Sequence, residues 1–177
     1  MSLILFERFL VFAEQAASSK PKLPTEIDSD ELNSALVSYG VVLLHSHMEQ
    51  CLQSAMEIKC QRCSDPEVRA FALSIRDDKT GKIGLDALKQ TLKRFSQTSN
   101  QAFKDYLVAF GGDAAWESIR NNRHTIGHYG TPASCSLADL RSYYGDIRRV
   151  LGFYCDVLGL TSAEVASISS LIVLPTP

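Results

Sequence analysis

The sequence predicts an all-α protein in which several helices pack as a bundle. Apolar residues return every three or four positions along most of the chain, and no segment alternates with the period of two that a strand requires. The chain has 177 residues, 45% of them hydrophobic, and contains no internal repeat. This length and composition predict one domain, residues 1–177, with short appendages.

Two helices are predicted in the first third of the chain. The first covers residues 2–17, where Leu3, Phe6, Leu10 and Ala13 form an apolar stripe. The prolines after it predict a loop, so residues 1–27 form an N-terminal helix and loop. The second helix covers residues 29–62, after Asp28 as its cap and with Glu31 at the reciprocal third position. Residues 36–52 are apolar over much of the helix circumference and are expected deep in the core.

The later elements are marked by proline and glycine. Pro66 predicts the first turn of a short helix that ends near Arg76, and residues 77–84 are predicted to form a polar turn. Loops are predicted at residues 111–113 and 130–136, and residues 172–177 form a frayed tail. Further helices are predicted over residues 85–96, 101–110, 114–128 and 137–158, and a last one after the capping-box pair Thr161 and Glu164.

The charge of the chain excludes attraction to nucleic acid or anionic lipid through a bulk positive field, because the net charge is −2. Phosphate binding therefore requires a local cluster. The chain has two such clusters, Arg120 with Arg123, and Arg141 with Arg148 and Arg149.

The cysteines and the apolar runs indicate a cytoplasmic location. An odd number of cysteines, five, lying mostly in helical patterns, is not typical of a secreted disulfide framework. The first residues lack the features of a signal peptide, and no apolar run approaches the roughly 20 residues of a membrane span. We therefore expect a protein without membrane contact.

The segment from Arg120 to Gly130 carries the strongest chemical signal in the chain. Arg120, His124 and His128 are four residues apart, so they line one side of a helix, and Arg123 lies about 100° from His124. Trp116, Ile119 and Ile126 lie on the flank and anchor the helix to the core, and Gly130 ends it. Arginine is a planar cation that fits phosphate oxygens, and histidine transfers protons near neutral pH. The pattern predicts a phosphate clamp beside a proton shuttle.

The segment Arg123-His-Thr-Ile-Gly-His128 resembles the signature of the HEPN superfamily, an arginine, a small polar residue and then a histidine after a short gap. His124 takes the polar position, whereas Tyr129 stands where glycine is frequent. Glu49, on the long predicted helix, resembles an acidic residue of the family's earlier helix. The similarity is greatest to HEPN domains of the RiboL-PSP type and covers roughly residues 30–160.

This resemblance implies an HEPN-like bundle that dimerises through the motif face and cleaves RNA without a metal or other cofactor. His128 would act as general base or acid, Arg123 would stabilise charge on the phosphate, and His124 or Asn122 would orient one of these groups. Arg120 would assist in phosphate binding and Glu49 is a weaker catalytic candidate. The protein is expected to be the toxin or effector of a toxin–antitoxin or defence system. The expected partners are RNA, a second copy of the chain, and an antitoxin or regulatory protein that masks the site, since an uncontrolled ribonuclease harms its host.

Other interpretations compete with this one. The same fold serves as a non-catalytic module for nucleotides, RNA or proteins, and arginines and histidines near a helix end are often only a solvated surface. Cys60 and Cys63 have the spacing of metal ligands but lack a second close pair, so thiols without a metal are expected. His45 and His47 cannot share a helix face, and we expect one in the core and one at an interface.

Overall fold

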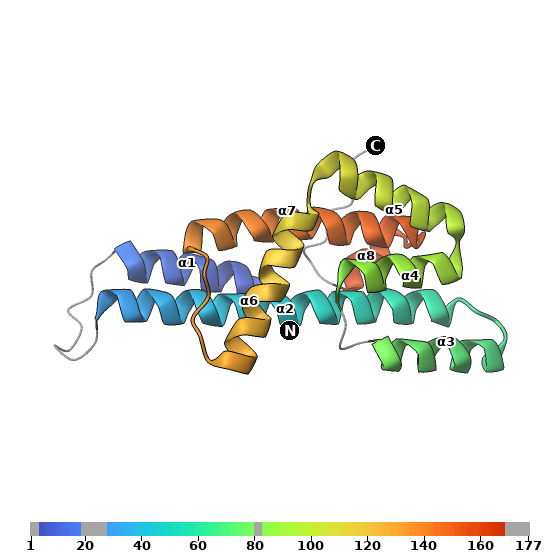
Figure 1. Ribbon diagram of the computed structural model, residues 1–177. Coiled ribbons are helices and arrows are strands. Elements are labelled where there is room, and N and C mark those ends of the chain that lie inside the picture. Colours follow the sequence, from blue (N-terminus) through green and yellow to red (C-terminus); the bar gives the residue numbers. More distant parts are fainter. Residues whose placement is uncertain (1–3, 19–27, 80–82, 169–177) are drawn as a thin grey trace.

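The computed structural model describes residues 4–18, 28–79 and 83–168, and these residues form eight α-helices without a strand (Figure 1). The predicted all-α class is confirmed. The loop expected around Pro21 and Pro24 and the tail at residues 172–177 lie outside the described residues.

The bundle is built on two long helices, α2 (Ser29–Gln61) and α7 (Leu137–Val157), which lie against each other (Figure 1). The middle of α2 is the core, as predicted, because Val41, Leu44 and Met48 are at most 1% exposed. Gly40 makes the close packing possible, since a Cβ atom there would lie 2.5 Å from Leu140 Cδ2. Helix α1 (Ile4–Ser18) packs against both long helices and buries Phe6, Leu10 and Ala13.

Asp28 caps α2 by accepting a hydrogen bond from the backbone N–H of Asp30 at 3.1 Å. The cap residue is as predicted, but this bond goes to the second helical position. The capping box expected at Thr161 is formed, because Glu164 Oε2 accepts from the Thr161 N–H and the Thr161 hydroxyl accepts from the Glu164 N–H. It opens α8 (Ser162–Ile168).

Helices α4 (Leu85–Phe95) and α5 (Gln97–Phe110) form a hairpin over one half of the bundle, and α3 (Pro66–Lys79) lies beside the end of α2 (Figure 1). The predicted start of α5, residue 101, is wrong by four residues. The Ser96 hydroxyl accepts the N–H of Ser99 at 3.2 Å, which starts the helix in a polar stretch without an apolar pattern. Helix α3 ends three residues later than predicted.

Helix α6 (Asp113–Tyr129) carries the Arg/His segment and crosses the long helices steeply (Figure 1). It packs against α2, α7 and α4. Across residues 4–18, 28–79 and 83–168, no helix combines the length and the apolar character that spanning a bilayer requires.

Candidate active site

The position of α6 is fixed by its apolar flank. Trp116 and Ile119 are fully buried, and Ile126 is half-buried against the core, as the sequence predicted. The Trp116 indole N–H donates to the carbonyl of Ile83 at 2.7 Å, which ties α6 to the segment that leads into α4. At the other end Gly130 has a φ of 63°, and its N–H donates to the Ile126 carbonyl at 3.1 Å. Glycine at this left-handed position ends the helix, as predicted.

A cavity of about 410 Å³ lies where α2, α4 and α6 meet. Its polar lining comes from two helices, His45 and Glu49 on α2 and Arg120, Arg123 and His124 on α6. The start of α4 supplies the remaining wall, Ile83, Gly84 and Ala87. Three of the proposed catalytic residues, Glu49, Arg123 and His124, therefore share one cavity although 74 positions separate Glu49 from Arg123 in the sequence.

His45 and Glu49 lie one helical turn apart, with His45 Nδ1 3.8 Å from Glu49 Oε2. Burial, together with the positive charges of Arg123 and Arg120, lowers the pKa of His45 from 6.5 to about 4, and burial is the largest of these causes. Burial also raises the pKa of Glu49, whereas Arg123 opposes that rise. His45 is thus a neutral imidazole at pH 7, and both of these side chains lie within the field of Arg123.

The two arginines of the cavity differ in their partners. The Arg120 guanidinium pairs with Glu117, at 2.6 Å from Nη2 to Oε2. Among the described residues, no carboxylate lies within ion-pair distance of Arg123. Arg123 is therefore the better placed of the two to accept an external anion.

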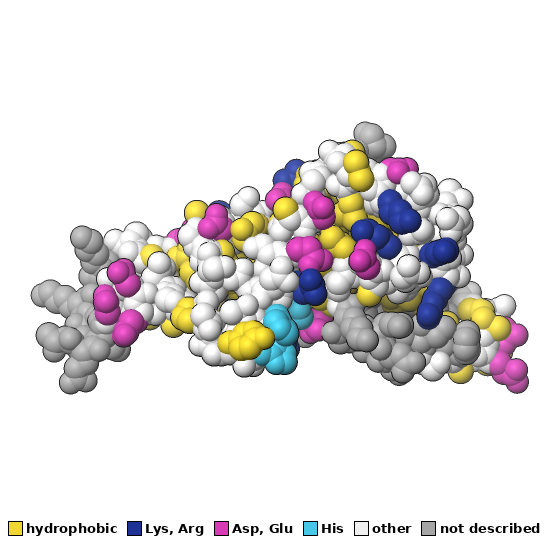
Figure 2. Space-filling view, viewed as in Figure 1, with side chains coloured by type: hydrophobic (Ala, Val, Ile, Leu, Met, Phe, Trp, Pro, Cys, Tyr) yellow, Lys and Arg dark blue, Asp and Glu magenta, His cyan; other side chains and the backbone are white. Residues whose placement is uncertain are grey.

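His128 lies one turn beyond His124, and the centres of the two rings are 4.4 Å apart. Both imidazoles are exposed, and Figure 2 shows histidine side chains gathered on the face of α6 beside an exposed hydrophobic side chain. Tyr129 is 71% exposed, and its ring centre lies 6.0 Å from that of His124. The lining of the cavity does not include His128. The structure thus brings His128 next to His124 but leaves it at the rim.

Asn122 points away from the cavity. It is 7% exposed, and its Oδ1 accepts hydrogen bonds from the backbone N–H and the hydroxyl of Ser134, at 2.7 and 3.1 Å. Its Nδ2 donates to the carbonyl of Ser118 at 2.9 Å. The amide is thus engaged with the loop after α6, and we assign Asn122 to positioning that loop instead of orienting a catalytic group.

Gly127 lies between Arg123 and His128 in the Arg/His segment and carries no side chain. The nearest atom to a Cβ built at this position is Arg123 Nη1, at 3.5 Å. That distance is an ordinary van der Waals contact, so the Arg123 side chain, which lies along the helix towards residue 127, does not require a glycine there.

Sequence reasoning missed two parts of the cavity. His45 was expected in the core or at an interface, yet it is 7% exposed and lines the cavity, while His47 is 3% exposed. The signal available was its spacing, since His45 lies four positions before Glu49 and so on the same helix face. The wall from α4 carried no signal, because Ile83, Gly84 and Ala87 have no chemistry of their own.

The arrangement favours an anion in the cavity over a divalent cation. Two guanidinium groups and one carboxylate line it, whereas Mg²⁺ and Ca²⁺ prefer several oxygen ligands. In the described part of the chain, no group of three histidine, cysteine, aspartate or glutamate residues is arranged to hold a metal ion. Two exposed imidazoles beside an unpaired guanidinium provide groups for proton transfer next to a bound phosphate.

The chain matches a known protein family. A family model described as RiboL-PSP-HEPN matches residues 10–159, which is most of the chain and includes α2, the cavity and the Arg/His segment. No curated protein and no solved structure matches the chain. The chain belongs to the RiboL-PSP-HEPN family.

Proposed function

We propose that this protein is an endoribonuclease that cleaves RNA by attack of the ribose 2′-hydroxyl, without a metal ion. The observation that carries the proposal is the cavity in which unpaired Arg123 and His124 of α6 meet His45 and Glu49 of α2, with His128 at the rim. Membership of an HEPN family supports the proposal, since RNA cleavage and nucleotide binding are the activities that this family indicates.

In this reaction one histidine removes the proton of the 2′-hydroxyl, and the resulting oxygen attacks the adjacent phosphorus. The bond from phosphorus to the 5′ oxygen breaks, and a second acid gives that oxygen a proton. His128 and His124 are the proposed proton carriers. Arg123, assisted by Arg120, stabilises the charge on the phosphate oxygens. The products are a 2′,3′-cyclic phosphate and a 5′-hydroxyl, and DNA is not cleaved because it lacks the attacking group.

Glu49 and neutral His45 form the back of the site on α2. Glu49 offsets part of the positive charge of the arginines. Burial raises the pKa of Glu49 and Arg123 lowers it, so an anion in the cavity would change that pKa. When a phosphate enters, its negative charge opposes the effect of the arginines on His45, which raises the pKa of that imidazole towards its ordinary value.

The decisive experiment is a cleavage assay on purified protein, with and without a chelator, using an RNA and a DNA of the same sequence. We expect chelator-resistant cleavage of RNA only, reduced by roughly 10²–10³ in Arg123→Ala and by roughly 10²–10⁴ in His128→Ala. Arg149→Ala is the matched control, because Arg149 lies on α7 with Asp146 and Phe110 as its contacts. Equal cleavage by all three variants would reject the assignment.

A homodimer is part of the proposal, because His128 lies outside the cavity that holds Arg123. A second copy that packs on the exposed His128 and Tyr129 would bring its own His128 towards the cavity. Mixing inactive Arg123→Ala and His128→Ala proteins tests this arrangement. Recovery of cleavage in the mixture requires a site shared between copies, whereas a mixture that stays inactive indicates that each site uses one chain.

A further part of the proposal is a toxin or defence role, in which an antitoxin or other regulatory protein covers the Arg/His face. Uncontrolled RNA cleavage harms the cell that makes the enzyme. Induced expression should therefore arrest growth, and His128→Ala should remove that effect at equal protein level. Growth arrest by His128→Ala as strong as by the wild type would contradict this role.

The second candidate function is a module of the same fold that binds RNA or a nucleotide without cleaving it. The position of His128 outside the cavity favours it, since the single chain does not bring that imidazole to the bound phosphate. RNA binding that is lost in Arg123→Ala, without cleavage by the wild type, supports this alternative.

A further inference from the structure

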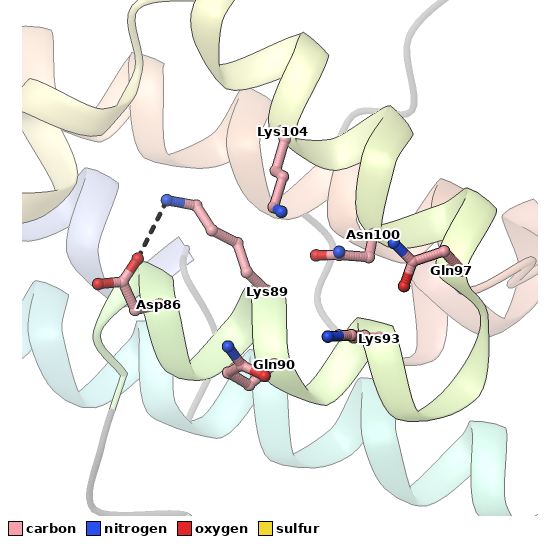
Figure 3. Close-up of a pocket in the computed structure, with 7 residues that line it drawn as sticks. All are labelled: Asp86, Lys89, Gln90, Lys93, Gln97, Asn100 and Lys104. Atoms are coloured by element: carbon pink, nitrogen blue, oxygen red, sulfur yellow. Dashed lines mark hydrogen bonds and ion pairs between the residues drawn. The ribbon is translucent and has the colours of Figure 1, made fainter.

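A second cavity, of about 370 Å³, lies between α4 and α5 and has lysines around it (Figure 3). Lys89 and Lys93 come from successive turns of α4, and Asn100 and Lys104 from successive turns of α5. The opposite faces of these helices bury Leu88, Leu92 and Phe103 in the core. The cavity is therefore the polar outer side of the seam between two amphipathic helices.

Asn100 marks the bottom of this cavity. The residue is 1% exposed, and its Oδ1 has no hydrogen-bond partner in the part of the chain that the structure describes. Figure 3 shows the amide among the side chains of Lys93, Gln97 and Lys104. A buried amide oxygen without a donor is unfavourable in a folded protein. A ligand that brings an N–H or O–H group into the cavity would satisfy it.

The charges around the cavity favour an anionic ligand. Lys89 pairs with Asp86 at 3.2 Å, but the Asp86 side chain is 96% exposed, so this pair is weak. Within the described ranges, neither Lys93 nor Lys104 has a carboxylate partner. Two unpaired ammonium groups therefore border a site whose buried group accepts a hydrogen bond.

Helix α4 connects this cavity to the candidate active site. Ala87 lines the active-site cavity, whereas Asp86 and Lys89, on either side of it in sequence, line the lysine-bordered one. Lys93 follows Ala87 by six positions, a rise of about 9 Å along the helix. In Figure 2 the histidines of α6 and a row of Lys and Arg side chains over α4 and α5 appear on the same face of the molecule.

We propose that the cavity between α4 and α5 binds one nucleotide of an RNA strand whose neighbouring segment enters the candidate active site. The phosphate contacts Lys93 and Lys104, and an N–H of the base donates to Asn100 Oδ1. The inference extends the proposed function by assigning a substrate-binding subsite outside the cleavage site. A phosphate alone would satisfy the lysines but not the amide oxygen, and a nucleotide supplies both the anion and the donor.

The test is binding of a fluorescently labelled single-stranded RNA, measured by anisotropy over a range of salt concentrations. The RNA carries 2′-O-methyl groups so that 2′-hydroxyl attack is impossible. Lys93→Gln/Lys104→Gln is compared with Arg94→Gln/Arg149→Gln, which removes the same charge from α4 and α7 outside the cavity.

We expect the lysine variant to bind RNA at least tenfold more weakly and to lower the salt slope by about 0.7, the value for the loss of one phosphate contact with a single strand. The control should bind within about threefold of the wild type. Asn100→Leu should also weaken binding while the protein melts at an equal or higher temperature, because the variant removes an unsatisfied buried group. Equal RNA binding by the lysine variant and the control overturns the proposal, whatever the behaviour of Asn100→Leu.

This outcome is distinguishable from failure of the proposed function. If the lysine variant binds RNA more weakly and the wild type does not cleave ordinary RNA, the subsite is supported and the nuclease is rejected. If cleavage depends on His128 and the lysine variant binds RNA as the wild type does, the nuclease is supported and the subsite is rejected.

Discussion

The Asn122 side chain holds Ser134 through two hydrogen bonds, one from the Ser134 backbone N–H at 2.7 Å and one from its hydroxyl at 3.1 Å. Asn122 is one of the buried polar residues, and its partner lies in the loop that joins α6 to α7. This pair fixes the chain that leaves the Arg/His helix. The next two residues, Arg123 and His124, are exposed. Asn122 therefore stabilises the fold, whereas its immediate neighbours are available to a ligand.

Asn122→Ala should lower the free energy of unfolding by about 1–2 kcal/mol, because it removes the two hydrogen bonds that Asn122 Oδ1 accepts from Ser134 and the one that its Nδ2 donates to the Ser118 carbonyl. Urea unfolding measures this change. Asn121→Ala is the matched control, since Asn121 is exposed, and it should change stability by less than about 0.5 kcal/mol. Equal effects of the two substitutions would show that the Ser134 bonds add nothing to stability.

His45 should make the protein less stable in acid. Its pKa is about 4 when folded and 6.5 when exposed, so the unfolded chain binds the proton more tightly between these values. The free energy of unfolding therefore falls as the pH drops from 6.5 towards 4, by about 3 kcal/mol in total from this residue. Unfolding measured in urea at several pH values tests this slope.

His45→Gln serves as the comparison, because it removes the titrating group and should flatten the slope in that range. The lowered pKa of His47 changes the pH slope of the unfolding free energy in the same direction as His45, and the raised pKa of Glu49 changes it in the opposite direction. Both residues remain in the variant, so their contributions do not affect the comparison. Identical slopes for wild type and His45→Gln would mean that His45 keeps its ordinary pKa in the folded protein.

Trp116→Phe should loosen the wall of the active-site cavity. The substitution removes the donor for the carbonyl of Ile83, which lines that cavity, and should lower stability by about 1–3 kcal/mol. Backbone amide exchange over residues 83–88 should become faster. Tyr154→Phe is a suitable control, because the Tyr154 hydroxyl donates to the weak acceptor Met56 Sδ, at 3.5 Å. A Trp116→Phe protein with unchanged exchange at the start of α4 would contradict this role.

Gly127→Ala should stabilise the single chain by up to about 1 kcal/mol, since alanine favours a helix and its Cβ would lie at ordinary contact distance from Arg123. Thermal melting at low protein concentration tests this prediction. Gly130→Ala is the contrasting variant, because φ at Gly130 is 63° and a side chain there is strained. Destabilisation by Gly127→Ala as large as by Gly130→Ala would indicate that another backbone contacts residue 127.

The sequence by itself determined the helical class, the course of the long helices and the residues of α6 that face inwards. Apolar spacing carries that information locally, so the sequence alone places Trp116 and Ile119 correctly in the core. The sequence also predicts helix ends that depend on a single residue, such as the end of α6 at Gly130. The sequence did not predict the start of α5, because its serine cap lies in a polar stretch without a periodic apolar pattern.

Only the tertiary structure decided which polar side chains meet. Periodicity shows that His45 and Glu49 share a helix face, but the crossing of α2 and α6 decides that this face meets Arg123. The loop between α6 and α7 folds back so that Ser134 bonds to buried Asn122, while Arg123, the next residue, stays exposed. The seam that collects Lys93, Asn100 and Lys104 likewise depends on how α4 folds back on α5. Contacts between distant segments depend on the angle at which helices pack, and that angle is set by side chains from both partners at once.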